Sequence, residues 1–469
     1  MRTKALILVS LALSACASPR AADLRLPGAY EAPAAAPAQT VALDQWWTAF
    51  GDADLTALVD EALARNVDVR TAAARLAEVR AQREGVFLGL LPSGDLTGAA
   101  RRTETEQLSG ANIDLPNFST YGTTENYQAN FNVSWEVDLF GRLLAANRSA
   151  AAELMASRFS YEGVRAAIAA QTADAWFQAR GLAIQLADAR ESARIQRSLY
   201  DTATKRASVG LAATSEPDRI AGDLARSEAE VTALEAELQA QKRAILILAG
   251  RVVEPTASLN TPPAVGQAPA VPAALPSELL QRRPDVREAE ARVRAAAGRQ
   301  DIAALAFFPT FTLTPGLGWS RQVQPTLETE SRSWTIGGTV MQPILSIPRL
   351  LTELKAENAR TEQAVIAYEK TVQTAFQEAE GALVRLDADR RRVTLLTEGE
   401  ARAARAYESA RLGYARGLTD LSTALSAEQA WRATRAQLTE AQVQALRRTV
   451  QAMKAIGGGW PVQAYAQAG

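Results

Sequence analysis

The fold is decided by a stretch in the first third of the chain, which reads YQANFNVSWEVD over residues 127–138. Apolar side chains alternate there with polar ones, and a period of two is typical of a half-buried β-strand. Weaker alternation recurs in three other segments of the chain. We therefore expect strands at about 94–104, 123–139, 310–321 and 332–346.

The length of these segments points to a membrane. Strands of about ten residues with aromatic side chains towards their ends are typical of an outer-membrane β-barrel. A half-buried sheet in a soluble protein alternates in the same way and is the alternative. Four strands are too few to close a barrel, for which about eight is the practical minimum. Two copies of the chain would supply eight strands and three copies twelve, and the spacing leaves both assemblies open.

Long helices are expected beside the strands. Proline is absent from 117–216 and from 349–460, and both stretches are rich in alanine, arginine and glutamate. The first predicts a helix from Arg142 to about Arg206, which would be roughly 95 Å long at 1.5 Å per residue. Because this exceeds an ordinary globular helix, we expect a coiled coil or a tube of helices.

An internal repeat organises the chain. LARNVDVR at 63–70 resembles LQRRPDVR at 280–287 with an offset of 217 residues, and Gly210 matches Gly417 with an offset of 207. Each copy reads as helix, two short strands, long helix, break at glycine and helix, so one domain is duplicated. The expected parts are a first repeat at 51–253, a linker at 254–275, a second repeat at 276–456 and a C-terminal tail at 457–469.

The beginning of the chain reads as a secretory signal. A basic start precedes an apolar run that is too short to span a bilayer. The only cysteine, Cys16, follows Ser14 and Ala15, and this arrangement resembles the lipobox of bacterial lipoproteins. The resemblance implies a signal peptide at 1–15 and a lipidated segment at 16–50, with an N-acyl diacylglycerol group on Cys16. The alternative is a chance cysteine at the end of an ordinary signal peptide.

The composition argues against an enzyme. The chain contains no histidine, which removes the commonest general base and the commonest metal ligand. A formal net charge of −1 provides no basic field for a nucleic acid. Carboxylates are spread beside arginines, as on a solvated helix face, and a catalytic carboxylate pair remains an alternative. We expect no catalytic residue, no metal and no cofactor other than the lipid.

The segment PSELLQRRPDVREAE at 276–290 resembles the signature of the outer-membrane efflux factors, the TolC/OprM-like family with its NodT-type lipoproteins. Phe308-Pro309 follows at the family's distance, and Trp46-Trp47 matches the family's opening segment. The resemblance implies a homotrimer with a 12-stranded outer-membrane β-barrel, four strands per chain, continuous with a 12-helix periplasmic α-barrel.

The same resemblance implies a function. The chain would be the exit duct of a tripartite pump for drugs or other small toxic compounds, anchored in the outer membrane and extending into the periplasm. Its partners would be a periplasmic adaptor and an inner-membrane transporter of the resistance-nodulation-division (RND) type. The alternatives are a duct for type I protein secretion and a lipid-anchored periplasmic coiled-coil scaffold without a pore.

Two groups of side chains are candidates for a role in transport. In this family the periplasmic end is closed by helix–turn–helix tips, which here would surround the two glycine breaks. The tip candidates are Arg206, Gly210, Glu216, Arg411, Tyr414, Arg416, Gly417 and Asp420. The polar side chains of the most regular strand are candidates for the barrel lumen: Asn130, Asn132 and Glu136.

Opposite charges beside both glycine breaks suggest a closed-state contact. Arg411 or Arg416 would pair across the tip interface with an acid such as Asp420 or Glu216. Asp420 has two interpretations, a residue favoured at a helix start or a member of an acidic constriction. Arg283-Pro284-Asp285 is expected to be structural, because proline suits the first turn of a helix and aspartate favours its N-terminus.

Overall fold

The computed structural model describes residues 22–31, 43–106, 122–210, 213–272, 276–324, 327–416 and 418–461. The chain forms two compact units, which are treated separately below. The sheet unit contains Ala77–Ala156 and Ala289–Ala367, and the hairpin unit contains Asp23–Leu76, Ser157–Glu288 and Tyr368–Gly469. Cys16 and Gly417 lie outside the described residues.

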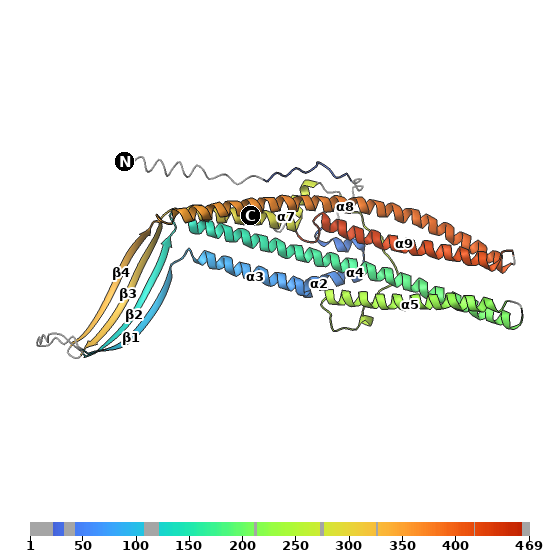
Figure 1. Cartoon of the computed structure of the whole chain (residues 1–469), viewed down its shortest axis with the longest axis horizontal. Helices are drawn as coiled ribbons and strands as arrows, with labels where there is room; N and C mark the ends of the chain where they lie inside the picture. Colours follow the sequence, from blue (N-terminus) through green and yellow to red (C-terminus); the bar gives the residue numbers. More distant parts are fainter. Residues whose placement is uncertain are drawn as a thin grey trace. The chain divides into compact units, whose positions relative to one another are not determined.

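The elements follow the expected repeat of helix, two strands and a long helical hairpin (Figure 1). The helices are η1 Leu43–Phe50, α2 Ala53–Arg65, α3 Val67–Leu88, α4 Arg142–Ser208, α5 Ser215–Leu248, η2 Thr256–Ser258, η3 Pro276–Glu278, α6 Leu279–Arg282, α7 Pro284–Leu305, α8 Ile347–Ala415 and α9 Leu421–Ala455. The strands are β1 Ser93–Thr105, β2 Gly122–Val137, β3 Thr310–Gln324 and β4 Leu327–Met341. The four strands and the mainly helical composition confirm the expected fold class.

The sheet unit holds one antiparallel sheet with the order β1-β2-β3-β4 (Figure 1). β2 and β3 come from different repeats and pair at the centre, as in Asn130 with Gly318 and Phe131 with Leu317. Among the described residues β1 and β4 each pair on one side only. The sheet therefore presents one unpaired edge from each repeat.

The register gives the sheet two different faces, because directly paired residues point to the same side. One face carries apolar side chains, among them Leu96, Phe131, Leu317, Trp334 and Ile336. Trp334 and Ile336 expose 76% and 74% of their surface in the single chain. The opposite face carries asparagine, serine, threonine and glycine. No described strand residue of either face is buried, whereas in a soluble half-buried sheet the apolar face would be covered.

One strand differs from the sequence-based expectation. The fourth strand was expected at about 332–346, but β4 begins at Leu327 and ends at Met341. Pro343 has no N–H to continue a ladder of hydrogen bonds, and the Gln342 side chain bonds to the Phe307 carbonyl instead. The early start reflects the partner strand, because Gln324 pairs with Leu327 and closes the hairpin there.

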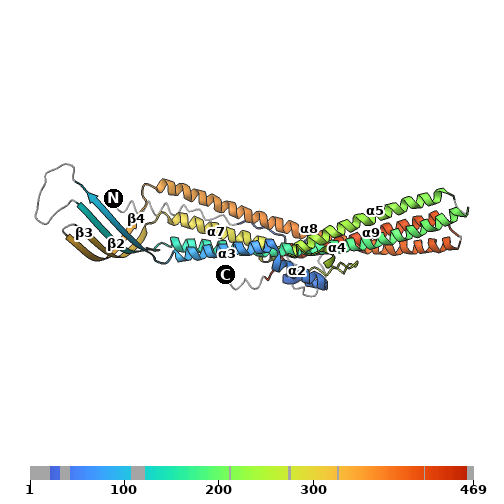
Figure 2. The same cartoon turned by 90° about the horizontal axis from the view of Figure 1, so that it is seen from below.

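The hairpin unit holds α5, α9 and the parts of α4 and α8 that follow Ser157 and Tyr368, together with η1 and α2. Within it α4 runs beside α5 and α8 beside α9 in both views (Figure 2). None of the described helices is long and apolar enough to cross a membrane. The core of the unit is built from small and aromatic side chains, with Trp46, Trp176 and Phe177 almost fully buried. Alanines such as Ala173 and Ala179 occupy much of the remaining core, which lets the helices approach closely.

Candidate functional site

The two hairpins turn where the sequence predicts them to. α4 ends at Ser208 and α5 begins at Ser215, with Gly210 between them at a φ of +73°. A left-handed residue is favourable for glycine, because it has no Cβ to clash. Arg206 lies in the last turn of α4 and Glu216 in the first turn of α5. The first tip therefore gathers its predicted candidates around one glycine turn.

The second tip differs in chemistry from the first. Asp420 is the N-cap of α9, and its carboxylate accepts a hydrogen bond of 2.7 Å from the Thr423 N–H. This bond, together with the Thr423 and Ser422 hydroxyls, lowers the pKa of Asp420. The helix-start interpretation is therefore confirmed for the single chain. The Arg411 guanidinium pairs with Glu408 on its own helix at 2.7 Å rather than with Asp420 or Glu216.

For the remaining tip candidates, Tyr414 and Arg416, the structure gives the position along the chain. Tyr414 lies in the last turn of α8, and Arg416 follows the end of that helix and is exposed. The proposed pairing of Arg416 or Arg411 across an interface between copies involves other copies of the chain, and it stays a prediction. The same holds for an acidic constriction at Asp420.

A seam between α4 and α9 joins the two hairpins, and the sequence analysis did not identify it. Arg447 binds Asp174 with two hydrogen bonds of 2.7 and 3.0 Å. Arg435 donates a hydrogen bond of 3.2 Å to one Asp188 oxygen and forms an ion pair of 2.8 Å with the other. Between them Gly181 lies so close to Val443 that an added Cβ would meet the valine methyl at 2.7 Å. We call these three contacts the α4–α9 seam.

The seam left a signal in the sequence. Asp174, Gly181 and Asp188 are separated by seven residues each, so they share one stripe of a coiled-coil helix. Two-pronged arginine–carboxylate bonds are directional and stronger than neutral hydrogen bonds. The seam therefore fixes the position of α9 along α4 at two points and sets their close approach at a third.

An aromatic cluster supports the seam on the second hairpin. The rings of Tyr407 and Trp431 stack at 5.3 Å with 8° between their planes. The Trp431 indole donates a hydrogen bond of 2.8 Å to Glu400, and the Arg435 guanidinium lies 5.7 Å from the indole centroid. Burial, followed by the charge of Glu428, raises the pKa of Tyr407. One arginine thus contacts both hairpins.

The predicted lumen residues share the polar face of the sheet. Asn130 and Asn132 lie beside Gly318 and Gly316, where an added Cβ would meet the asparagine Oδ1 atoms at 3.0 and 3.4 Å. Glu136 lies at the end of the same face, but Arg142 binds it with two hydrogen bonds of 2.7 and 2.9 Å. Asn130 and Asn132 are therefore the better lumen candidates, because the charge of Glu136 is already compensated.

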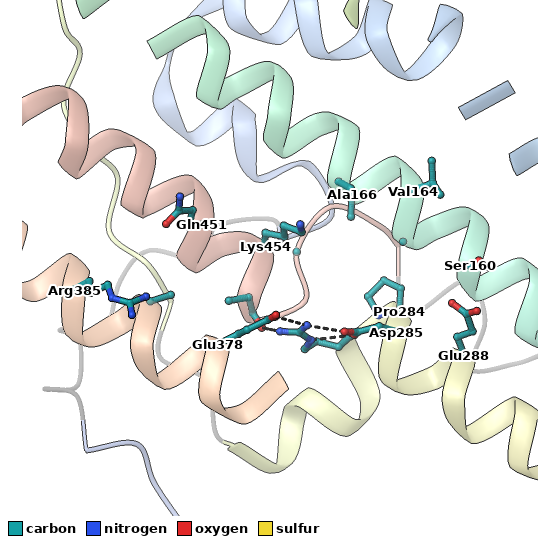
Figure 3. Close-up of a pocket in the computed structure, with 16 residues that line it drawn as sticks. Ser160, Val164, Ala166, Pro284, Asp285, Glu288, Glu378, Arg385, Gln451 and Lys454 are labelled. Atoms are coloured by element: carbon teal, nitrogen blue, oxygen red, sulfur yellow. Dashed lines mark hydrogen bonds and ion pairs between the residues drawn. The ribbon is translucent and has the colours of Figure 1, made fainter. Parts of the chain in front are cut away.

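Arg283 is the centre of a buried ion network. The residue is 8% exposed, and its guanidinium donates to Asp285 at 2.6 Å, to Glu378 at 2.7 Å and to the Ala455 carbonyl at 3.2 Å. Burial lowers its pKa, but these bonds outweigh burial and leave the pKa raised. Figure 3 shows the two carboxylates converging beside Pro284, where α7 begins.

This network confirms a structural role for the predicted motif. Arg283 ties the start of α7 to α8 and to the end of α9, which the sequence alone did not indicate. The groove beside it has a volume of about 620 Å³ and is open to solvent. Nearby, the indole of Trp460 donates to the Arg282 carbonyl at 2.7 Å, and Gly457 passes over the same residue at a φ of +86°.

The N-terminal segment 22–31 lies along α8. The Asp23 N–H donates to Glu369 at 2.8 Å, and the Glu31 N–H donates to Glu380 at 3.2 Å. The Tyr30 ring stacks on Phe376 at 5.8 Å, and burial together with the Glu380 charge raises the pKa of Tyr30 to about 12. The segment that follows the predicted lipid is therefore fixed to the protein at both ends.

No group of three or more acidic side chains among the described residues is placed to hold a metal ion. The predicted lipid site, Cys16, lies outside these residues. What the described part of the chain offers is a two-faced sheet, two helical tips and the contacts that tie the two hairpins together.

Comparisons with known proteins agree with this geometry. The family model described as outer membrane efflux protein matches residues 58–251 and 275–458, one match for each repeat. The pyoverdine export outer membrane protein OpmQ of Pseudomonas aeruginosa is 29% identical over 475 residues, covering 98% of this chain and 97% of its own length. Outer membrane protein OprJ of the same species is 29% identical over 466 residues, covering 97% and 95%.

A solved structure extends the likeness to three dimensions. The outer-membrane channel OprN superimposes with a TM-score of 0.80 at 26% identity, covering 94% of this chain and 100% of its own. The match spans the sheet and the helices. The resemblance read from the Arg-Arg-Pro-Asp motif is confirmed by all three comparisons.

Proposed function

Because this chain belongs to the outer membrane efflux protein family, we propose that three copies of it form the exit duct of a tripartite efflux pump. The observation that carries the proposal is the two-faced sheet with an unpaired edge on each side. Such a sheet is stable in lipid only if its edges pair with other strands, since each unpaired backbone group there costs several kcal/mol. Head-to-tail pairing of β4 with β1 of the next copy removes both edges.

Three copies suit the polar face better than two. Twelve strands leave room for a channel, whereas about eight strands enclose a filled interior. The polar face is lined by Asn130, Asn132 and small residues such as Gly316 and Gly318. Small, uncharged side chains keep a lumen wide and wet. A passive conduit for small compounds, with selectivity set by the inner pump, is the function that fits this lining.

The partners are a periplasmic adaptor and an inner-membrane transporter of the RND type. The lipid is placed on Cys16 as an auxiliary anchor. Cys16 lies seven positions before Asp23, and a chain of seven residues spans at most about 25 Å when extended. Since Asp23 is bound to Glu369, the lipid would be held within that distance of α8. The relative named for pyoverdine export suggests small secreted or toxic compounds as cargo.

The α4–α9 seam is the contact that keeps the duct closed at rest. Opening the tips requires the two hairpins to move apart. Of the two ion pairs in the seam, Arg435 with Asp188 is the one that lies beside the aromatic cluster. A double-mutant cycle of Arg435→Gln and Asp188→Asn tests this role by single-channel conductance. We expect each variant to raise conductance and the pair to raise it no further. If the two substitutions raise the conductance additively, or do not change it, the seam does not take part in closing the duct.

The duct itself is tested without reference to the gate. The Cys16→Ser variant, made with an ordinary signal peptide, should still form trimers that need detergent and dissociate on heating. The purified trimer of this variant should also conduct ions when it is inserted into planar bilayers. A variant that is soluble without detergent would support the lipid-anchored scaffold instead. Export of a protein substrate by an ATP-driven transporter, with no loss of drug resistance on deletion, would support type I secretion.

A further inference from the structure

The apolar face of the sheet ends in a band of charged side chains. The band lies at the end where the strands are joined to each other rather than to helices. We call it the charged collar, and its members by register are Arg102, Glu104, Glu125, Arg321, Glu328, Glu330 and Arg332. Their rows follow directly on that of Trp334 and Leu317, so the collar continues the apolar face.

The charges are concentrated on one face only. In the same rows of the polar face, Arg101 is the one charged side chain among the described residues. Solubility of the strand ends would be served equally by charges on either face. A collar confined to the apolar face therefore indicates a polar partner that lies beside lipid chains, such as the headgroup layer of a membrane.

Aromatic side chains connect the collar to the apolar rows. The Trp319 indole donates to Glu330 at 2.9 Å, and the Tyr127 hydroxyl donates to Glu125 at 3.0 Å. Both rings thus have their polar atoms directed towards the collar. Tryptophan and tyrosine favour this position at the boundary between lipid chains and headgroups.

Each arginine of the collar lies beside a glutamate, but this contact uses only part of its hydrogen-bonding capacity. Arg321 binds Glu328 at 2.6 Å, Arg102 lies 3.5 Å from Glu125, and Arg332 lies 3.8 Å from Glu330. A guanidinium has five N–H donors, so each pair leaves most of them available. The side chain of Arg332 is 85% exposed and that of Arg102 is 71% exposed. Guanidinium groups bind phosphate with paired, parallel hydrogen bonds.

We propose that the charged collar binds the phosphate groups of a phosphorylated glycolipid in the outward leaflet of the outer membrane. The three arginines take the phosphates, and Glu125, Glu328 and Glu330 keep the guanidinium groups oriented. The proposal rests on the proposed duct, in which the apolar face meets lipid. In a closed barrel the collars of three copies would form a continuous ring of phosphate sites.

The test uses the full-length trimer purified in detergent and purified lipopolysaccharide as the probe. Native mass spectrometry counts the glycolipids retained by the wild type and by the triple variant Arg102→Gln, Arg321→Gln, Arg332→Gln. The expected result is a loss of affinity of about tenfold or more in the triple variant, because charge-assisted bonds are the strong ones. Enzymatically dephosphorylated lipopolysaccharide should bind the wild type as weakly as the intact form binds the variant.

Arg101→Gln is the matched control, because it removes the same charge from the same strand on the polar face. Its retention of lipopolysaccharide should equal that of the wild type. Equal retention by the triple variant, or equal loss in Arg101→Gln, would overturn the proposal. If the triple variant does not assemble, Arg332→Gln alone is compared with Arg101→Gln, and equal binding by these two overturns it. A wild type that conducts but binds no lipopolysaccharide refutes the collar alone, whereas a wild type that forms no trimer refutes the duct.

Discussion

The two helical hairpins come from one duplicated unit, yet their helices are joined by different chemistry. α4 and α5 are bridged by two surface ion pairs, Arg190 with Glu235 at 2.6 Å and Arg197 with Glu228. α8 and α9 are joined by the stacked rings of Tyr407 and Trp431 and by one partly buried ion pair, Arg448 with Asp389 at 3.4 Å. Surface ion pairs are weak and screened by salt, whereas stacking depends on buried area and geometry.

The 207-residue offset shows where the copies diverged. Glu228, which bridges the first hairpin, corresponds to Arg435 in the second. Arg435 does not bridge its own hairpin but binds Asp188 on α4. Arg197, the partner of Glu228, corresponds to Ala404, so the second hairpin lacks both members of this pair. The two copies therefore differ at both positions, and the arginine of the second copy contacts the other hairpin.

The largest loss of stability is expected from a substitution in the aromatic cluster of the second hairpin. Trp431→Ala removes the ring stack, the bond to Glu400 and the contact with Arg435. Truncating a buried tryptophan costs about 3–5 kcal/mol, and for this partly buried ring we expect about 2–3 kcal/mol. Thermal unfolding of the trimer measures the loss. Trp431→Phe, which keeps the stack, should recover more than half, and an unchanged melting temperature in Trp431→Ala would contradict the role of the cluster.

The close approach of Gly181 to Val443 is the next test. Gly181→Leu inserts a side chain where even a Cβ would lie 2.7 Å from the valine. Overpacking of this kind costs about 1–3 kcal/mol, and the strain should push α9 away from α4 and raise single-channel conductance. Gly222→Leu is the control, since an added Cβ there meets nothing within 4 Å. Equal conductance in Gly181→Leu and Gly222→Leu would show that the seam does not control opening of the duct.

The ion pairs of the first hairpin should have smaller effects. Arg190→Gln and Arg197→Gln each remove one exposed pair, and each pair is worth about 0.2–1 kcal/mol. Salt should weaken the first hairpin more than the second, because the pairs of the first are exposed whereas the second also relies on the ring stack and on a partly buried ion pair. Hydrogen exchange of α5 and α9 amides at low and high ionic strength measures the difference. A loss of protection in α9 equal to that in α5 would contradict the contrast between the hairpins.

The first turn of α9 is stabilised by a side-chain cap that the first turn of α5 lacks. Asp420 caps α9 with its side chain, whereas Thr214 precedes α5 without a side-chain cap bond. Because the pKa of Asp420 is lowered, its contribution is complete above the ordinary value of 3.8 and is lost as pH falls through the lowered pKa. Amide exchange in the first turn of α9 should therefore rise below pH 3.8, while α5 shows no such step.

A matched pair of substitutions separates the cap from a charge effect. Asp420→Asn keeps an oxygen acceptor for the Thr423 N–H and should preserve the first turn of α9. Asp420→Ala should fray it. If conductance changes in Asp420→Asn, where the cap survives and the charge is lost, the constriction interpretation of Asp420 gains support; an unchanged conductance leaves the cap as its role.

The sequence was most informative where a local rule applies. Alternation predicted β1 to β3 to within three residues at each end, because side chains of a strand point to alternate faces. The absence of proline from an alanine-rich stretch predicted α4 from Arg142 to about Arg206, and the helix ends at Ser208. The end of β4 was missed because the hydrogen bonds of Gln342 and the pairing with β3 decide it.

The candidate residues at the tips were less predictable. Spacing placed Gly210 and Asp420 correctly in turns and caps, because backbone conformation and helix ends follow local rules. The partner of Arg411 proved to be Glu408, three residues away, since neighbours on one helix face meet more easily than side chains on different helices.

The duplicated plan, the long helices, the alternating strands and the family could all be inferred from the amino-acid sequence alone. These follow from periodicity and from motifs that are read along the chain. Only the tertiary structure decided that Arg435 meets Asp188, that Arg283 joins three helices and that the charged collar lies on the apolar face. Such contacts join residues up to about 250 positions apart, and their pairing depends on how helices and strands come together in space, which no local rule specifies.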